Sequence, residues 1–484
     1  MTASGTAGTL VERVVEQVAA RIGGRGLPPG ARLPSIRSAA REFGVSRFTV
    51  VEAYDRLVAR GLIESRRGSG FYVRQVEVIA PTRRVHAWAE AQTAGVDHVW
   101  LLRNMFKRLP PEMMPGAGVL PPSWLDAELI EQSLRAVGRH AGPAMLDYGH
   151  PQGYPPLREQ ICQRLERLSI PATVDGLLCT TGVTQGLDLV AQRYLRAGDP
   201  VLVESPSWFV LFGQFAALGL RVLGVPRLAD GPCLETLETL VKRYRPRLFF
   251  VSGALHNPTG STISVNRAHR LLQLAETHDL TIVEDDVNAD FLPDALLGQG
   301  PRLAAADGLR RVIYLGGFSK SLAANLRVGF VATTADRARE LTDLKMLQGL
   351  TSPELGERVV YRALSEGHYR RHLHRLQNRL EQARGALVQA LEALDMPVFV
   401  VPRGGMFVYA RSALPARALA ERMMDHGYLM APGDLFMPDG EHSQWSRFNV
   451  ATSLEPAMLN CLRSALAGPD AADRSDGSRH KLPS

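Results

Sequence analysis

A lysine and an arginine lie seven residues apart in one stretch of the 484-residue chain, VIYLGGFSKSLAANLRVGF at positions 312–330. The apolar run at 312–315 predicts a short buried strand. It ends at Gly316 and Gly317, where backbone can approach a ligand closely. Lys320 can form an imine with an aldehyde cofactor, and Arg327 can bind a phosphate through paired hydrogen bonds. Taken alone, the stretch also fits a surface lysine in a loop.

The segments around this lysine alternate between strand and helix patterns. Apolar runs of strand length are separated by helical stretches between positions 177 and 317, namely LLCTTG, VLVESP, RVLGVP, LFFVSG, LTIVEDD and VIYLGG. This alternation predicts a mostly parallel sheet, with ligand chemistry at the carboxyl ends of its strands.

Candidate binding residues do follow these runs. Val183 and Thr184 begin a helix whose free N–H groups and hydroxyl suit a phosphate, although an ordinary helix cap gives the same pattern. Trp208 is either a ring for stacking or a core side chain, and Asn257 offers an amide in the unusual tract HNPTG. Asp285 can pair with a protonated ring nitrogen. A metal site is its alternative, but no histidine or cysteine cluster accompanies it.

With Lys320 and Arg327, these groups form the set that holds pyridoxal 5'-phosphate (PLP). Such a set binds the phosphate, stacks on the ring, provides hydrogen-bond partners for the ring oxygen and the ring nitrogen, and supplies the lysine that forms the imine. Residues from about 119 to 466 also resemble fold-type I aminotransferases, through the motifs SPSW, HNPTG, EDD, FSKxLxxxLRxG and RFNVA. The resemblance implies an α/β PLP-dependent transferase fold with PLP as its cofactor.

The same resemblance implies a role for each matching residue. Lys320 is the Schiff-base lysine, Asp285 the partner of the pyridine nitrogen and Asn257 the partner of the ring hydroxyl, while Trp208 stacks on the ring. The phosphate is held by Val183, Thr184, Ser319 and Arg327. Arg447, in RFNVATS, binds a substrate or effector carboxylate, with a structural salt bridge as its alternative. Tyr148 reaches the phosphate of the neighbouring subunit.

The chain departs from the aminotransferase pattern at two places. Many members carry a tyrosine shortly after the aspartate, where this chain has Val287 and Asn288. Many also carry a hydroxyl residue three positions before the lysine, where this chain has Gly317. Both differences leave the cofactor contacts in place but count against efficient transamination. The Gly/Pro-rich segment PGAGVLPP at 115–122 is a further candidate lining of the site, without diagnostic chemistry.

Positive charge is concentrated at the N-terminus. Residues 1–74 contain twelve arginines and six acidic residues, a net charge of +6 out of +7 for the whole chain. A basic head on a nearly neutral body is typical of a nucleic-acid-binding module, with a solvated basic surface as the alternative. Four widely spaced cysteines, no signal core and no membrane-length apolar run predict a cytoplasmic protein without structural disulfides.

The head has the pattern of a winged helix-turn-helix. Helices are expected at 10–22, from Pro34 and Ser35 to about 43, and from Ser46 to about 60, followed by a wing, LIESRRGSGFYVR. The second helix of such a unit presents its N-terminal residues to base edges. The expected DNA contacts are Ser35, Arg37, Ser46, Arg47, Thr49, Arg66 and Arg67. The string LPSIR, GVSRFTVVEAYDRL and SRRGSGFYV resembles the GntR family of bacterial repressors.

A GntR-like winged helix followed by an aminotransferase-like domain is the arrangement of the MocR regulators, which this sequence resembles over nearly its whole length. We expect a winged helix at 1–74, a linker at 75–96, a PLP-binding effector domain at 97–467 and a disordered tail at 468–484. The expected function is a DNA-binding regulator that senses an amine, an amino acid or a B6 vitamer. The resemblance further implies a head-to-tail homodimer on repeated half-sites. A working aminotransferase with an accessory DNA-binding head is the alternative.

Overall fold

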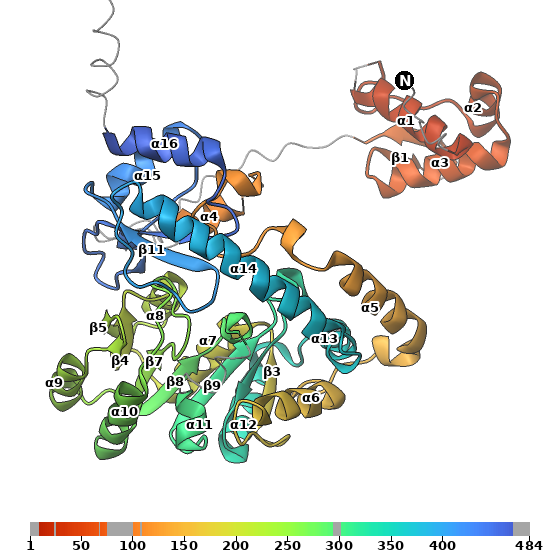
Figure 1. The fold of residues 1–484 in the computed structure, drawn as a ribbon. Helices are drawn as coiled ribbons and strands as arrows, with labels where there is room; N and C mark the ends of the chain where they lie inside the picture. Colours follow the sequence, from red (N-terminus) through yellow and green to blue (C-terminus); the bar gives the residue numbers. More distant parts are fainter. Residues whose placement is uncertain are drawn as a thin grey trace, which may run out of the picture. The chain divides into compact units, whose positions relative to one another are not determined.

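The structure is a computed structural model that describes residues 9–23, 26–66, 68–74, 100–106, 109–293 and 302–467. The chain divides into two compact units, Met1–Thr93 and Ala94–Ser484 (Figure 1). The expected linker at 75–96, the tail at 468–484 and the wing residue Arg67 lie outside the described residues.

The first unit is built from three helices and a hairpin, α1 (Leu10–Gly23), α2 (Ile36–Phe43), α3 (Arg47–Ala59), β1 (Ile63–Arg66) and β2 (Gly70–Val73). Ser35 caps α2 by accepting a hydrogen bond from the Ser38 amide, and Gly44 ends α2 in the left-handed region at φ 65°. The two strands pair antiparallel. The predicted winged helix-turn-helix is therefore confirmed.

The core of this unit comes from the apolar faces of the helices. Val50, Tyr54 and Leu57 on α3 are fully buried against α1 residues such as Val14. The Tyr54 hydroxyl also donates to the Pro34 carbonyl, 3.0 Å away. This hydrogen bond fixes α3 against the segment that leads into α2.

An eight-stranded sheet forms the centre of the second unit. Its order is β3 (Leu177–Thr180), β10 (Gly329–Ala332), β9 (Val312–Gly317), β8 (Thr281–Asp285), β7 (Leu248–Val251), β4 (Pro200–Ser205), β5 (Arg221–Leu228) and β6 (Gly231–Pro232). Of these strands, β10 and β6 run against the others. The mostly parallel sheet that the sequence predicts is confirmed, and the reversed β10 is an addition to it.

Helices cover both faces of this sheet (Figure 1). One face packs against α7 (Val183–Tyr194), α8 (Phe209–Ala217) and α12 (Ala335–Gly349). The other packs against α6 (Pro155–Glu166), α9 (Leu234–Tyr244), α10 (Val265–Thr277), α11 (Leu303–Asp307) and α13 (Glu354–Ser365). Successive strand residues alternate between the two cores, as Leu177 and Leu178 do.

A smaller three-stranded sheet completes the second unit. Its order is β11 (Phe407–Arg411), β13 (Trp445–Asn449) and β12 (Ala431–Pro432). It packs with α15 (Ala416–Asp425), α16 (Pro456–Ala467) and the long α14 (His368–Glu392), which leads from the larger sheet to the smaller one (Figure 1). The N-terminal part of the unit contributes α4 (Trp100–Met105) and α5 (Ala127–His140). Within the described residues, no helix has the length and apolar character that a membrane span requires.

Candidate functional site

Lys320 follows β9 at the carboxyl edge of the large sheet. Its Nζ donates to the carbonyl oxygen of Gly118, 2.7 Å away. Burial and the positive charges of Arg447 and Arg327 lower the pKa of Lys320 to about 8, against the opposing effect of Asp285. A lysine with a depressed pKa is neutral, and so nucleophilic, for more of the time near neutral pH.

Asp285 ends β8, the strand next to β9, where it lies opposite Leu315 in the register. Its Oδ1 accepts from the backbone amide of Val287 at 3.1 Å. Burial raises the pKa of Asp285 to about 6, and Lys320 acts in the opposite direction. A positively charged ring nitrogen beside this buried carboxylate would favour its ionised form and act as its counterion.

An anion cradle lies where α7 begins, beside the loop that follows β9. Arg327 sits in the left-handed region at φ 52° and donates to the Ser319 hydroxyl at 3.3 Å and the Thr181 carbonyl at 3.2 Å. Gly329 pairs with residues of both β3 and β9. A Cβ on Gly329 would lie only 2.6 Å from the amide nitrogen of Val183, and a Cβ on Gly182, which precedes α7, would lie 2.5 Å from a terminal nitrogen of Arg327. The first turn of α7, with Val183 and Thr184, therefore begins close to the Arg327 guanidinium, which suits a phosphate.

Arg447 is the most deeply buried charged group of the site. It lies on β13, is 1% exposed, and packs its guanidinium over the Phe407 ring at 4.4 Å and the Phe436 ring at 4.9 Å. One terminal nitrogen donates to Asn257 Oδ1 at 2.8 Å and the other to the Gly116 carbonyl at 2.7 Å. Burial lowers the pKa of Arg447 to about 9.

No carboxylate pairs with Arg447 among the residues that the structure describes. Its Nε is buried and has no hydrogen-bond partner there either. A buried cation without a counterion is costly unless a ligand supplies the negative charge. The structural salt bridge that the sequence left open as the alternative for Arg447 is thus absent from the described part of the chain.

A strap formed by residues 114–119 joins these groups. Its carbonyl oxygens accept from Arg447 at Gly116 and from Lys320 at Gly118. Asn449, two residues after Arg447 on β13, donates its side-chain amide to the Ala117 and Val119 carbonyls at 3.0 and 2.8 Å. The Gly/Pro-rich composition points to this segment, but only the fold reveals that its carbonyls bind both cations.

Asn257 and Trp208 lie on loops that follow β7 and β4. Trp208 is half-buried at the start of α8, and Asn257 contacts Arg447 as described. A buried network supports the loop of Asn257. In it, Arg227 pairs with Glu204 at 2.5 Å, and Glu204 lies 3.4 Å from the ring of His256, the residue that precedes Asn257. Sequence reasoning misses this network, because its members are far apart in the chain.

The two departures from the aminotransferase pattern have local structural consequences. Asn288 is buried and donates to the Leu255 carbonyl at 3.2 Å, so its amide nitrogen supports a loop. A Cβ on Gly317 would lie 3.1 Å from Cγ2 of Val183. A hydroxyl residue at 317 would therefore need the side chain of Val183 to shift by a few tenths of an ångström.

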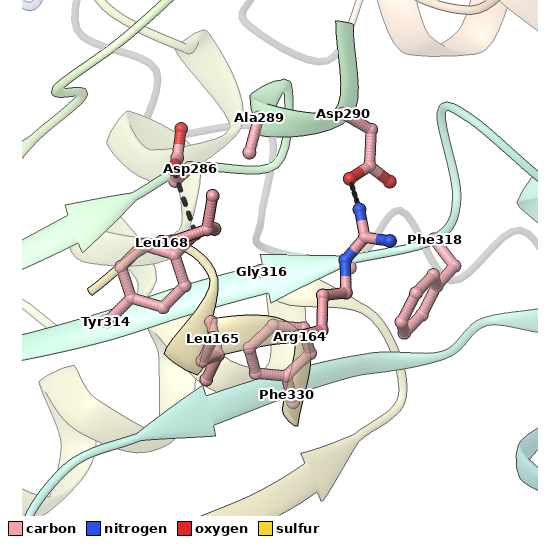
Figure 2. Close-up of a pocket in the computed structure, with 11 residues that line it drawn as sticks. Arg164, Leu165, Leu168, Asp286, Ala289, Asp290, Tyr314, Gly316, Phe318 and Phe330 are labelled. Carbon is pink, nitrogen blue, oxygen red and sulfur yellow. Dashed lines mark hydrogen bonds and ion pairs between the residues drawn. The ribbon is translucent and has the colours of Figure 1, made fainter. Parts of the chain in front are cut away.

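A small pocket lies behind the lysine loop (Figure 2). Figure 2 shows Asp290 joined to Arg164 of α6, and Asp286 joined to Tyr314 of β9. Asp290 also accepts from the hydroxyl of Ser321, the residue after Lys320, at 2.8 Å. The backbone at Lys320 is therefore held from behind by a buried carboxylate.

No hydrogen bond or ion pair joins Tyr148 to these groups within the described residues. Its side chain is 74% exposed, and its backbone amide donates a hydrogen bond to Asp147. The expected contact with the phosphate across a dimer stays a prediction.

Six of the predicted DNA contacts lie among the described residues of the first unit, and Arg67 lies outside them. Arg37 and Arg47 are exposed near the starts of α2 and α3 and have no ion pair among the described residues. Ser46 caps α3 by accepting from the Thr49 amide at 3.1 Å, and their hydroxyls lie 2.8 Å apart. Arg66 is already engaged, because it pairs with Glu64 at 2.7 Å and stacks on Tyr72.

The fold and this arrangement define an aminotransferase-like domain behind a winged helix. The model for aminotransferase class I and II matches residues 115–466, and that for bacterial regulatory proteins of the gntR family matches residues 10–73. The chain belongs to the class I and II aminotransferase family and carries a GntR-type DNA-binding domain in front of it. This is the domain composition of the MocR regulators.

Relatives of full length are named as regulators. The chain is 26% identical to the HTH-type transcriptional regulator YdfD of Bacillus subtilis over 96% of this chain and 97% of that protein. It is 27% identical to the HTH-type regulator YdcR of Escherichia coli over 91% and 94% of the two chains. The chain is thus a GntR-type regulator fused to an aminotransferase domain.

Aminotransferases match the second unit. The chain is 32% identical to 2-aminoadipate transaminase of Thermus thermophilus over 76% of this chain and 93% of that protein. The solved structure of LysN, an alpha-aminoadipate aminotransferase of Thermus thermophilus, is 30% identical and has a TM-score of 0.71 over 80% of this chain and 100% of that one. The structure of Pyrococcus horikoshii kynurenine aminotransferase, 23% identical, has a TM-score of 0.71 over 80% and 97% of the two chains, which supports the fold.

Proposed function

We propose that this regulator binds PLP in its aminotransferase-like domain and senses an amino acid, an amine or a B6 vitamer there. An α-amino acid is the effector class that the site favours. The observation that carries the proposal is Arg447, a buried guanidinium beside Lys320 without a carboxylate partner among the described residues. The amine of an amino acid would exchange with Lys320 at the cofactor, while its carboxylate paired with Arg447.

The donor set fits PLP. Val183, Thr184, Ser319 and Arg327 would hold the phosphate, Asp285 the ring nitrogen, Asn257 the ring hydroxyl and Trp208 the ring face. PLP, when bound, supplies an aldehyde carbon that forms a C=N bond with a primary amine. In this chain that amine is Lys320. The LysN structure, which was solved in complex with N-(5'-phosphopyridoxyl)-L-leucine, supports this assignment.

Binding of an effector at the site would change the contacts of the strap at 114–119. An effector carboxylate at Arg447 would compete with the Gly116 carbonyl. An effector amine that replaced Lys320 at the cofactor would free the Lys320 amine to donate to the Gly118 carbonyl again. The strap lies between the linker and the body of the domain in the chain. A changed set of strap contacts is therefore a route by which the effector biases the position of the winged helix and the half-site spacing it recognises.

A homodimer is part of the proposal. The segments around Tyr148 and the start of α13 lie side by side, because the His150 amide donates to Glu354 at 3.3 Å. These segments and the end of α12 expose large apolar side chains, namely Leu146, Tyr148, Leu347, Leu350 and Leu355. Exposed apolar groups gathered in this way mark an interaction surface. A second copy on this surface would let Tyr148 approach the partner's phosphate cradle, as the head-to-tail arrangement requires.

The alternative is a working aminotransferase with a DNA-binding head, which the identity to 2-aminoadipate transaminase favours. The two functions separate in one assay. Purified protein loaded with PLP is mixed with amino acids and a 2-oxo acid, and product formation is followed. Turnover at about 1–10³ per second would establish the enzyme, whereas the regulator proposal predicts rates far below this range.

The effector is found by titrating amino acids, amines and B6 vitamers into the PLP-loaded protein. Near-visible absorbance reports chemistry at Lys320, and promoter binding is followed in the same samples. The proposal expects both signals to respond to the same compound. An Arg447→Gln variant should lose the response to amino acids and keep the response to simple amines. Equal responses to amino acids in both proteins would remove Arg447 from the effector site.

A further inference from the structure

Phe48 is a large apolar side chain that the winged helix leaves uncovered. Its side chain is 77% exposed, on the first turn of α3 between Arg47 and Thr49. The other aromatic residues nearby are used by the fold. Tyr54 is fully buried and meets Phe71 edge-on at 5.0 Å, and Phe43 packs against the core. Phe48 belongs to none of the apolar clusters among the described residues.

The backbone at Phe48 is held in place by the fold, although its ring is exposed. Ser46 caps the turn on which it lies, through the 3.1 Å hydrogen bond from Thr49. The opposite face of α3 is locked into the core by Val50, Ala53 and Leu57, each 0% exposed. The helix therefore presents Phe48 to the outside at a defined place. Val51, one turn further along the same exposed face, is 38% exposed.

The surroundings indicate what covers this ring. Arg47 precedes Phe48 and is exposed at the start of α3, Arg37 is exposed at the start of α2 in the same unit, and the head carries most of the net positive charge of the chain. The major groove of DNA suits an exposed phenyl ring next to an exposed arginine, because it combines phosphates and guanine acceptors with one apolar group, the 5-methyl of thymine.

We propose that Phe48 is a specificity-determining residue that packs against the 5-methyl group of a pyrimidine in each operator half-site. The inference rests on the DNA-binding role of the head. Arg47 binds a neighbouring guanine or phosphate, and Phe48 selects thymine at the adjacent position. The chemistry recognised is the methyl group, which thymine and 5-methylcytosine share.

Replacing thymine by uracil removes that methyl group and leaves the hydrogen-bonding edges of the base unchanged. The operator is first defined by selecting random duplexes with the full-length protein. Each thymine of the selected site is then replaced singly by uracil, and binding is measured by fluorescence anisotropy at one fixed salt concentration. Wild-type protein should lose about three- to tenfold in affinity at one thymine per half-site, the effect of exposing roughly one methyl group and its ring contact.

Phe48→Ala should bind the thymine and uracil duplexes equally. Val58→Ala, which shortens an exposed apolar side chain at the far end of α3, is the matched control and should discriminate as the wild type does. The exposed ring makes no contact in the core, so the thermal unfolding of Phe48→Ala should match that of the wild type. A duplex with 5-methylcytosine at the sensitive position keeps the methyl group but not the hydrogen-bonding edge of thymine. It therefore distinguishes selection for the methyl group from selection for the whole thymine edge.

Two results would overturn the inference. One is a Phe48→Ala protein that keeps the uracil penalty of the wild type, and the other is a wild-type protein indifferent to every uracil. Either would leave DNA binding itself intact and would remove Phe48 from base readout. A loss of operator affinity in Arg47→Ala, together with a uracil penalty that the wild type shows and Phe48→Ala lacks, supports both the DNA-binding role and the inference.

Discussion

The Nζ atom of Lys320 and the carbonyl oxygen of Gly118 lie 2.7 Å apart, although 202 positions separate them in the sequence. Two residues before Gly118, the Gly116 carbonyl binds the guanidinium of Arg447. The expected cofactor lysine and the expected carboxylate-binding arginine are thus held by the same short strap. A ligand that engages either cation must replace a contact to the chain that leads back toward the DNA-binding head.

The strap should be sensitive to substitution at Gly116. A Cβ there would lie 2.3 Å from the backbone nitrogen of Ala431, so Gly116→Ala has to displace the strap. We expect faster hydrogen exchange in residues 113–120 and DNA binding that no longer depends on effector. Gly138→Ala is the control, because nothing lies within 4 Å of its Cβ on α5. Unchanged exchange and unchanged effector response in Gly116→Ala would exclude the strap as the coupling element.

The uptake of PLP should depend on pH with a midpoint near 8. The pKa of Lys320 is lowered to about 8, and only the neutral amine attacks an aldehyde. The covalent rate, followed by absorbance, should therefore rise as pH increases toward 8 and level off above it. Arg447→Gln removes one of the charges that lowers this pKa, so its midpoint should move to higher pH. A midpoint near the ordinary lysine value of about 10 in the wild type would contradict the described environment of Lys320.

Gly317 and Val183 should be coupled energetically. Gly317→Ser places a Cβ 3.1 Å from Val183 Cγ2, and overpacking of this kind costs about 1–3 kcal/mol. Val183→Ala removes the methyl groups in the way, so the double variant should recover much of that loss in a urea-unfolding cycle. Gly213→Ser on α8, where nothing lies within 4 Å, is the matched control. Additive effects of the two substitutions would show that the residues do not share this space.

Arg47 should contribute to operator binding where Arg56 on the same helix does not. Arg47 is exposed at the start of α3, whereas Arg56 pairs with Glu52 at 2.6 Å. Arg47→Ala should lower operator affinity by about tenfold or more, the effect of a lost base or phosphate contact. Arg56→Ala should bind nearly as well as the wild type, and both variants should keep the Lys320-dependent absorbance. Wild-type affinity in Arg47→Ala would remove this residue from the DNA surface.

The sequence predicts the parts of the fold that depend on local pattern. The three helices and the hairpin of the head follow from apolar spacing, caps at Ser35 and Ser46 and the turn at Gly44. The order of apolar runs also predicts a mostly parallel sheet with Asp285 and Lys320 at the carboxyl ends of its strands. The fold shows that those two strands are neighbours. The reversed strand β10 escapes prediction, because direction depends on pairing with β3 and β9 and leaves no local signal.

Contacts between distant segments could not be predicted in the same way. The sequence names Arg447 and Asn257 as binding residues but does not predict their hydrogen bond, because β13 and the loop after β7 meet only in the folded domain. The acceptors at Gly116 and Gly118 are backbone carbonyls, which every residue has. Only the fold selects the ones that meet a buried cation.

The central claim is that chemistry at Lys320 controls DNA binding by the head. It is tested by measuring operator affinity and footprint for PLP-loaded wild type and for Lys320→Ala, each with and without the compound that changes the wild-type absorbance. The account predicts that the compound changes the affinity or the footprint of the wild type and that Lys320→Ala binds the operator without responding. An equal response in both proteins, or no response in the wild type despite the absorbance change, would contradict it.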